Sequence, residues 1–219
     1  MEAWRDETVS VVIIELLTLR VWLFLQLLIK EIGDDNEERV NLFFEHGLDV
    51  NLKFDAAEHK KRSPIHIAAV KGSLNSILAM IGQGVEVDPV DSEGRTPLSL
   101  AIEHNKFTCV RGLIELGANL ELTDKYGRTP LMFACALGSK EMAELLIQFK
   151  ANVHACNNMK ETCMSFAQKS KNQELIMFLV NKGVSIRPQS GRMMRPPSGT
   201  RRPAMNRTSS KSGLQMTPS

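Results

Sequence analysis

Thr96-Pro97-Leu98-Ser99 is one of four similar segments that recur along this chain at a constant interval. The others are SPIH at residues 63–66, TPLM at 129–132 and TCMS at 162–165, so each begins 33 residues after the one before. A second series, at Gly84-Val85, Gly117-Ala118, Lys150-Ala151 and Gly183-Val184, keeps the same interval of 33. A fixed period of this length indicates a repeat architecture in which each repeat is one supersecondary unit.

The stretch from Asp91 to Asp124 shows what one unit encodes. It opens with the turn sequence DSEG, in which Asp bonds to nearby amides and Gly accepts a positive φ angle. Thr96 then stands where the N-cap of a short helix belongs, with Pro97 at the first helical position. A second helix with apolar residues at helical spacing follows, and Gly117 predicts its left-handed end.

Such a pair of short helices cannot bury its apolar faces alone, so we expect the units to stack on one another. The pattern Asp-x-x-Gly-x-Thr-Pro-Leu-x-x-Ala, followed by Leu-Gly-Ala, resembles the ankyrin repeat, most closely at Asp91–Ala118 and Asp124–Ala151. The resemblance implies an all-α ankyrin-repeat solenoid: helix–turn–helix units with β-hairpin-like loops, about five in number with the degenerate ends. We therefore divide the chain into an apolar N-terminal segment (1–25), the solenoid (26–186) and a tail (187–219).

The outer units depart from this pattern. The first lacks the Thr-Pro segment, and residues 28–33 stand where its first helix is expected. Lys61 and Lys160 replace the turn glycine, Lys150 replaces a helix-ending glycine, and Cys163 replaces the proline. A residue with a Cβ costs about 1 kcal/mol in a left-handed position. Degenerate ends around a regular middle are typical of a capped solenoid.

The apolar segment Val11–Ile29 is interrupted only by Glu15, Thr18, Arg20 and Gln26. Its length could span a bilayer, but a central charge such as Arg20 costs about 2.5–3.5 kcal/mol on insertion scales. The segment also lacks the basic start and the small-residue cleavage site of a secretory signal. We interpret it as a capping helix laid against the first repeat, with a membrane anchor or an oligomer contact as the alternatives.

The tail from Arg187 carries seven basic residues and no acidic one, whereas residues 1–186 have a net charge of −5. Its Pro, Ser and Arg content predicts disorder. The basic charge favours an acidic partner, such as nucleic acid, anionic lipid or a polyanionic filament, and the alternative is a solvated tail with no dedicated partner. Ser198, Ser209, Ser210 and Thr217 are candidate phosphorylation sites, because phosphate there would lower the positive charge.

No motif for catalysis is found: there is no glycine-rich phosphate loop, no HExxH helix and no GxSxG elbow. We therefore expect a non-enzymatic protein with no cofactor, and we interpret His66 as a structural residue that bonds to backbone between units. The four cysteines show neither disulfide nor zinc spacing, although His154, Cys156 and Cys163 could be taken for a metal cluster. Unpaired thiols indicate a reducing compartment, so we expect a cytoplasmic protein, with the nucleus or a membrane-tethered form as alternatives.

In ankyrin-repeat proteins, the hairpin tips and the exposed side of each first helix form a concave surface that binds another protein. The resemblance places this surface at the following residues, unit by unit: His59, Lys60, Arg62 and Lys71; Ser92, Glu93, Arg95, Glu103 and His104; Lys125, Tyr126, Arg128 and Leu137; Asn158, Met159, Glu161 and Lys169.

Two features of this surface stand out. Arg62, Arg95 and Arg128 are 33 residues apart and would offer bidentate donors to a partner's carboxylates, unless arginine at this position serves the stacking of the repeats. Tyr126 is the only tyrosine and falls near Leu137, which suggests a binding hot spot. We expect a monomeric adaptor or scaffold that binds one partner protein. The alternatives are an inhibitor of an enzyme or transcription factor, and an ankyrin protein anchored in a membrane by Val11–Ile29.

Overall fold

The computed structural model of the chain describes residues 23–49, 53 and 61–184. The chain divides into two units, Met1–Arg187 and Pro188–Ser219, and the second lies outside the described residues. The candidate phosphorylation sites, His59, Lys60 and residues 11–22 of the apolar segment also lie outside them. The predicted boundaries of the head and the tail therefore stay predictions.

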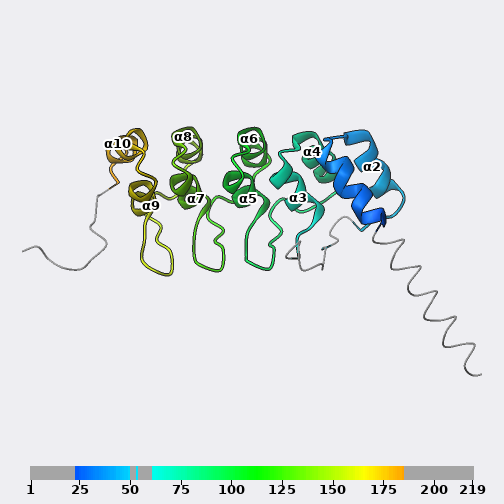
Figure 1. Cartoon of the computed structure of the whole chain (residues 1–219), viewed down its shortest axis with the longest axis horizontal. Coiled ribbons are helices and arrows are strands. Elements are labelled where there is room, and N and C mark those ends of the chain that lie inside the picture. The colour runs from blue at the N-terminus through cyan, green and yellow to red at the C-terminus, as the bar shows by residue number, and fades with distance from the viewer. Residues whose placement is uncertain (1–22, 50–52, 54–60, 185–219) are drawn as a thin grey trace, which may run out of the picture. The chain divides into compact units, whose positions relative to one another are not determined.

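The described part of the first unit is a row of helical pairs (Figure 1). Residues 23–33 are helical. The helices that follow are α2 (Glu37–Glu45), α3 (Pro64–Lys71), α4 (Leu74–Gly82), α5 (Pro97–Glu103), α6 (Phe107–Glu115), α7 (Pro130–Leu137), α8 (Lys140–Gln148), α9 (Cys163–Ser170) and α10 (Gln173–Asn181). The predicted all-α solenoid of stacked helix–turn–helix units is confirmed.

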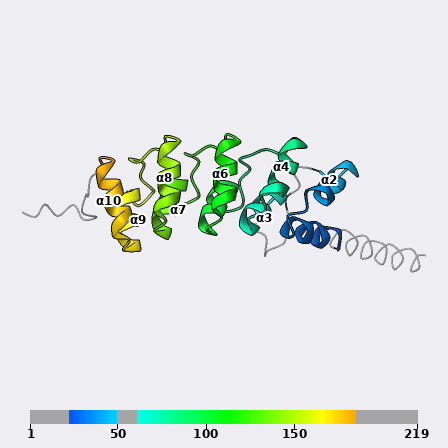
Figure 2. The ribbon, with the colours of Figure 1, turned by 90° about the horizontal axis from the view of Figure 1, so that it is seen from above.

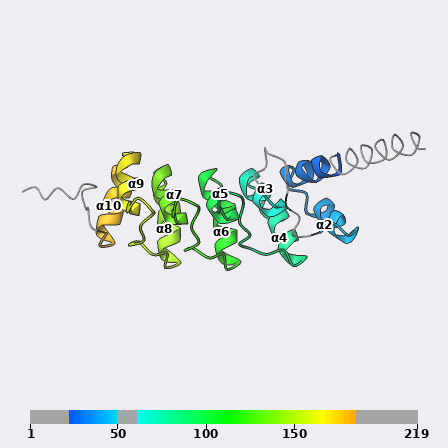
Figure 3. The ribbon, with the colours of Figure 1, turned by 90° about the horizontal axis from the view of Figure 1, so that it is seen from below.

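The helices form two layers, seen from opposite sides in Figures 2 and 3. The first helices of the units (α3, α5, α7 and α9) pack against one another, and the second helices (α2, α4, α6, α8 and α10) form the other layer. The loops that precede α5, α7 and α9 project side by side from the layer of first helices, and we call these three loops the fingers (Figure 1). A continuous apolar core runs between the layers, from Leu28 to Val184.

The N-terminal caps follow the predicted chemistry. The Thr96 hydroxyl oxygen accepts from the Ser99 amide at 3.2 Å, and Thr129 accepts from the Met132 amide at 3.4 Å. Proline occupies the first turn of both helices, where a missing N–H costs nothing. In the last unit, Cys163 stands in place of proline and donates its thiol proton to the carbonyl of Val153 at 3.1 Å.

Left-handed residues mark the ends of helices and the turns of the loops. The left-handed conformation predicted for Lys61, Lys150 and Lys160 is confirmed, because their φ angles are 55°, 68° and 60°. A further series after the first helices, which our sequence analysis did not identify, consists of Gly72, Asn105, Gly138 and Lys171, with φ angles from 57° to 92°.

The first unit of the solenoid is formed by residues 23–33 and α2. Leu28 and Ile32 are fully buried in the core, so residues 28–33 provide the first helix of this unit as predicted. The Glu31 carboxylate accepts from Arg39 at 2.9 Å and joins this helix to α2. Among the described residues, no helix combines the length and the apolar character needed to cross a membrane.

Candidate protein-binding surface

Each of the three fingers that the structure describes in full is built on one side-chain acceptor at its base: Asp91, Asp124 or Asn157. In the second full repeat, Asp91 Oδ1 accepts from the amides of Glu93 at 2.8 Å and Arg95 at 2.9 Å. Asp124 and Asn157 repeat this arrangement 33 and 66 residues later, with bonds of 2.8–3.0 Å to the amides two and four residues on. A backbone hydrogen bond closes the turn: the amide three residues after the acceptor donates to the acceptor residue's carbonyl, as Gly94 N does to Asp91 O at 3.0 Å. Each tip is therefore held in one conformation.

Neighbouring fingers are also bonded to one another. The Lys125 amide donates to the carbonyl of Glu93 at 2.9 Å, and the Asn158 amide donates to the carbonyl of Tyr126 at 3.1 Å. The Asn158 side chain adds a bond to the carbonyl of Lys125 at 3.2 Å. The tips of three successive fingers thus form a fixed row, which lowers the entropy that a binding partner would have to remove.

The arginine row is engaged inside the protein. Arg95 is only 6% exposed and donates through Nε and Nη2 to Asp91 Oδ2, at 3.1 and 2.9 Å. Its Nη1 donates to Glu103 at 3.2 Å. Burial alone would raise the pKa of Asp91, but the amides of Arg95 and Glu93 and the Arg95 guanidinium hold that pKa below its usual value.

The other two arginines have similar roles. Arg128 donates to Asp124 Oδ2 through Nε at 2.8 Å, with Nη2 at 2.6 Å from the same oxygen. Arg62 approaches Asp91 of the next unit, with Nε 3.6 Å from Oδ2. The three guanidinium groups therefore face carboxylates of this chain. This arrangement corresponds to the alternative in which the arginines serve the repeats themselves and not the carboxylates of a partner.

Arg128 also orders the tip of the third finger. Its guanidinium lies 4.4 Å from the centre of the Phe133 ring and 5.1 Å from that of Tyr126. Lys125 Nζ lies 5.1 Å from the same Tyr126 ring. These cation–π contacts hold the tyrosine ring while half of its surface, 52%, remains open to solvent.

Tyr126 is one of three large apolar side chains exposed on adjacent units. Leu137 ends α7, and Met159 stands at the tip of the last finger with 74% of its surface exposed. We call these three residues the apolar anchors. The bond between Asn158 and Tyr126 shows that their two fingers are neighbours.

The remaining predicted positions are polar and differ in how they are used. Lys71, Ser92, His104 and Asn158 are exposed. Glu93 lies 3.8 Å from Lys125, and Glu161 accepts from Lys169 at 2.5 Å. Our sequence analysis missed that the residue before the Thr at the N-cap forms an ion pair with the residue eight positions later in two units. These pairs are Arg95 with Glu103 and, with the signs exchanged, Glu161 with Lys169. The spacing of eight was the available signal.

His66 is structural, as predicted. Its ring is fully buried, and Nε2 donates to the carbonyl of Arg95 in the next unit at 3.1 Å. Nδ1 accepts from the amide and the hydroxyl of Ser63 at 3.1 and 2.8 Å. Burial lowers the pKa of this imidazole to about 4, so the ring is neutral and joins the first two full repeats.

The thiols do not form a metal site in the part of the chain that the structure describes. All four cysteines are free, and only Cys156 is exposed. No group of three or more His, Cys, Asp or Glu side chains in residues 23–49, 53 and 61–184 is placed to hold a metal ion.

Comparison with known families agrees with this geometry. The family model for ankyrin repeats (3 copies) matches residues 25–124 and 116–190, which is most of the chain. The chain therefore belongs to the ankyrin-repeat family. A search of curated proteins found no match to this sequence.

Proposed function

We propose that this chain is a non-enzymatic adaptor or scaffold of the cytoplasm that binds a partner protein through its fingers and the adjoining ends of its first helices. Ankyrin repeats generally mediate protein–protein interaction, and the family is typically non-enzymatic. The observation that carries the proposal is the set of apolar anchors: Tyr126 and Met159 are exposed on a row of fingers that is already fixed, and Leu137 is exposed at the end of α7.

The anchors have the properties of a binding hot spot. Tyrosine and other large side chains dominate the energy of interfaces when a partner covers them fully. The backbone bonds between fingers keep Tyr126 and Met159 in place before any partner arrives, so little ordering entropy remains to be lost. Exposed Lys125 lies over the Tyr126 ring and exposed Lys160 follows Met159 in the chain, which favours a partner with acidic residues at the rim.

The test uses the full chain and a variant that removes two anchors, Tyr126→Ala with Met159→Ala. The control is Leu78→Ala with Phe107→Ala, because both are large apolar side chains exposed on the layer of second helices, away from the fingers. Partners are identified by proximity labelling in cells, and the affinity of the strongest is measured by calorimetry. We expect the anchor variant to weaken binding about 100-fold, while the control binds like the wild type.

Equal binding by both variants would refute the proposed site. A folded anchor variant, checked by circular dichroism and thermal unfolding, is required for this comparison. An activity assay on the captured partner would then separate a scaffold, which leaves that activity unchanged, from an inhibitor.

A further inference from the structure

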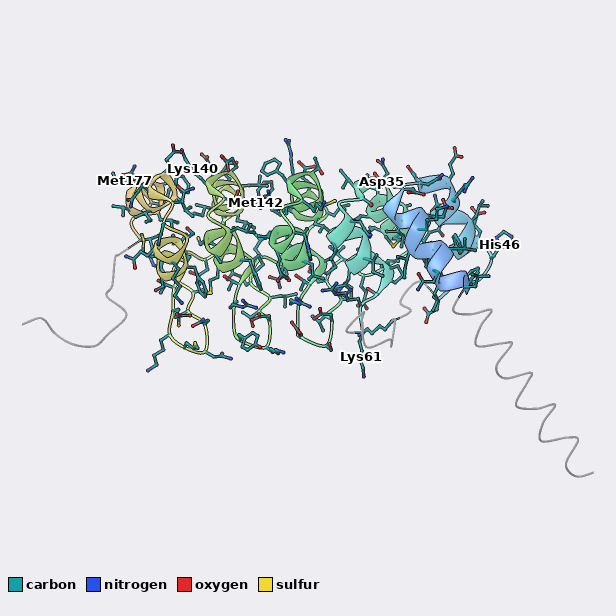
Figure 4. All side chains as sticks on the ribbon, in the orientation of Figure 1. Asp35, His46, Lys61, Lys140, Met142 and Met177 are labelled. Atoms are coloured by element: carbon teal, nitrogen blue, oxygen red, sulfur yellow. The ribbon has the colours of Figure 1, made fainter. Side chains whose placement is uncertain are left out.

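The layer of second helices contains a groove between α6 and α8. The second helices pack less closely than the first helices, which are in close contact from α3 to α9. Between α6 and α8 this wider spacing leaves a hollow of about 390 Å³, lined by side chains of both helices. In Figure 4 the layer of second helices, marked by Lys140 and Met177, lies opposite the fingers, so the groove and the fingers are on different sides of the solenoid.

An exposed phenylalanine stands at each end of the groove. Phe107 begins α6 and is 42% exposed, and Phe149 follows directly after α8 and is 46% exposed. Phe149 corresponds to Leu116 of the preceding unit, which lies nine residues after Phe107. The two phenylalanines are therefore offset by about 13 Å along the helices. Leu145 is partly buried and lines the groove between them.

The same groove carries an excess of negative charge. Its lining residues include three glutamates, Glu115, Glu141 and Glu144, against the single guanidinium of Arg111. Arg111 donates from Nε to Glu115 at 2.9 Å, so its charge is already offset within α6. Glu141 accepts from the Ser139 hydroxyl at 3.3 Å, but among the described residues neither Glu141 nor Glu144 has a cationic partner.

The lysine at the start of α8 does not neutralise these carboxylates. Lys140 Nζ lies 3.6 Å from Glu174 of α10, on the other side of α8. It lines a separate hollow with Met177, and Figure 4 shows these two residues close together. The groove between α6 and α8 is therefore complementary to a surface that presents apolar and basic side chains together.

A groove between two neighbouring helices has the shape to receive a third helix, since the side-chain ridges of a helix pack into such grooves. Residues seven or eight positions apart lie on one face of a helix and are separated by about 10–12 Å. This distance is close to the offset between Phe107 and Phe149. A helix with apolar anchors at that spacing, and with Lys or Arg beside them, matches both the aromatic ends of the groove and the carboxylates between them.

We propose that the groove between α6 and α8 binds a basic amphipathic helix of a partner protein. The apolar anchors of that helix contact Phe107 and Phe149, and its basic side chains pair with Glu141 and Glu144. This site is separate from the fingers, so the proposal goes beyond the proposed function and does not depend on it.

The test uses the full chain and a fluorescently labelled synthetic helix of about 14 residues, with leucine on one face and lysine on the other. Binding is measured by fluorescence anisotropy at low salt, because exposed ion pairs are screened. We expect Glu141→Gln with Glu144→Gln to raise the dissociation constant about 5-fold, since two exposed ion pairs are lost. The control, Glu45→Gln with Glu86→Gln, removes the same charge at exposed positions outside the groove and should bind like the wild type.

The apolar part of the groove is tested with Phe149→Ala, which should raise the dissociation constant about 10-fold. Its control is Leu78→Ala, because Leu78 is 44% exposed on α4, outside the groove. Circular dichroism and thermal unfolding check that each variant is folded.

Unchanged binding by either groove variant would overturn the proposal, and so would equally tight binding of a peptide with glutamate in place of lysine. A dimer of the free chain that dissociates in Phe149→Ala would also overturn it, because a second copy would then occupy the groove. The fingers carry none of these substitutions, so failure of this proposal leaves the proposed finger site untouched.

Discussion

Acidification from pH 7 to pH 5 should destabilise this protein through one side chain, His66. The ring is fully buried at the contact between the first two full repeats, and burial lowers its pKa to about 4 from an ordinary value of 6.5. The Ser63 amide points at Nδ1, so a proton at that nitrogen would break this bond and require the Ser63 hydroxyl to turn. Protonation of His66 therefore weakens the native contact.

The sign and size of the effect follow from the two pKa values. Between pH 6.5 and pH 4, the unfolded chain binds a proton at His66 and the folded chain does not, so stability falls as the pH falls. From pH 7 to pH 5 this difference amounts to about 2 kcal/mol. For a domain of this size, such a loss corresponds to a decrease of about 4–8 °C in the melting temperature.

Asp88 and Asp91 also have shifted pKa values, and their contributions to the pH dependence of stability must be separated from that of His66. The pKa of Asp91 is held below its usual value, so its contribution is lost only at a pH lower than this window. Burial raises the pKa of Asp88, which acts in the opposite direction on acidification. Both groups remain in a His66 variant and cancel when its pH dependence is compared with that of the wild type.

The assay is urea unfolding, followed by circular dichroism at pH 7 and pH 5, of the wild type, His66→Gln and the control His104→Gln. His104 is an exposed histidine on the neighbouring unit. His66→Gln should be less stable at pH 7, because three buried hydrogen bonds are altered, but it should lose about 2 kcal/mol less on acidification than the wild type. An equal loss in His66→Gln and the wild type would refute the assigned pKa and the neutral ring.

Three further predictions concern stability and are measured by the same urea unfolding. Asp91→Asn should cost about 3 kcal/mol, because it leaves the buried Arg95 guanidinium without its main partner, whereas Asp124→Asn should cost less because Arg128 is partly exposed. Gly127→Ala should destabilise more than Gly84→Ala: both residues have positive φ, but the added Cβ at position 127 would lie 2.9 Å from the Asn158 backbone nitrogen, and at position 84 it meets nothing within 4 Å. Lys171→Gly should stabilise by about 0.5–1 kcal/mol, since φ is 60° at a position that glycine occupies in two other units, and no gain would mean that the lysine side chain makes a compensating contact.

The repeat period allowed most of the fold to be predicted, for a local reason. Caps, turns and left-handed stops depend on residues within one unit, so Thr96, Pro97, Gly94 and Gly117 could be placed from sequence alone. The stacking of units follows from the same period, because each helical pair needs a neighbour to bury its apolar side.

The candidate site was less predictable because exposure depends on contacts between residues far apart in sequence. Arg95 resembles a surface arginine in the alignment of the repeats, yet it is buried by Asp91 on one side and Glu103 on the other. The separation of four between Asp91 and Arg95, repeated at Asp124 and Arg128, was a visible signal of an internal pair. The exposure of Leu27 and Leu42 left no such signal, since only the stacked structure shows which helix faces lack a neighbour among the described residues.

The last finger shows that the shape of the tips and their charge are set by different atoms. Asn157 keeps the Oδ1 acceptor that bonds the amides of Met159 and Glu161, so the finger has the same backbone as its neighbours. It lacks the carboxylate that binds arginine in the interior units, and the chain places Glu161 where they have Arg95 and Arg128. Lys169 and the side-chain amide of Asn157 both donate to the Glu161 carboxylate, and these two bonds lower its pKa. Because the backbone is constant and the charges differ, a partner must distinguish the tips by their side chains. Tyr126 and Met159 are large apolar side chains exposed on the tips that the structure describes.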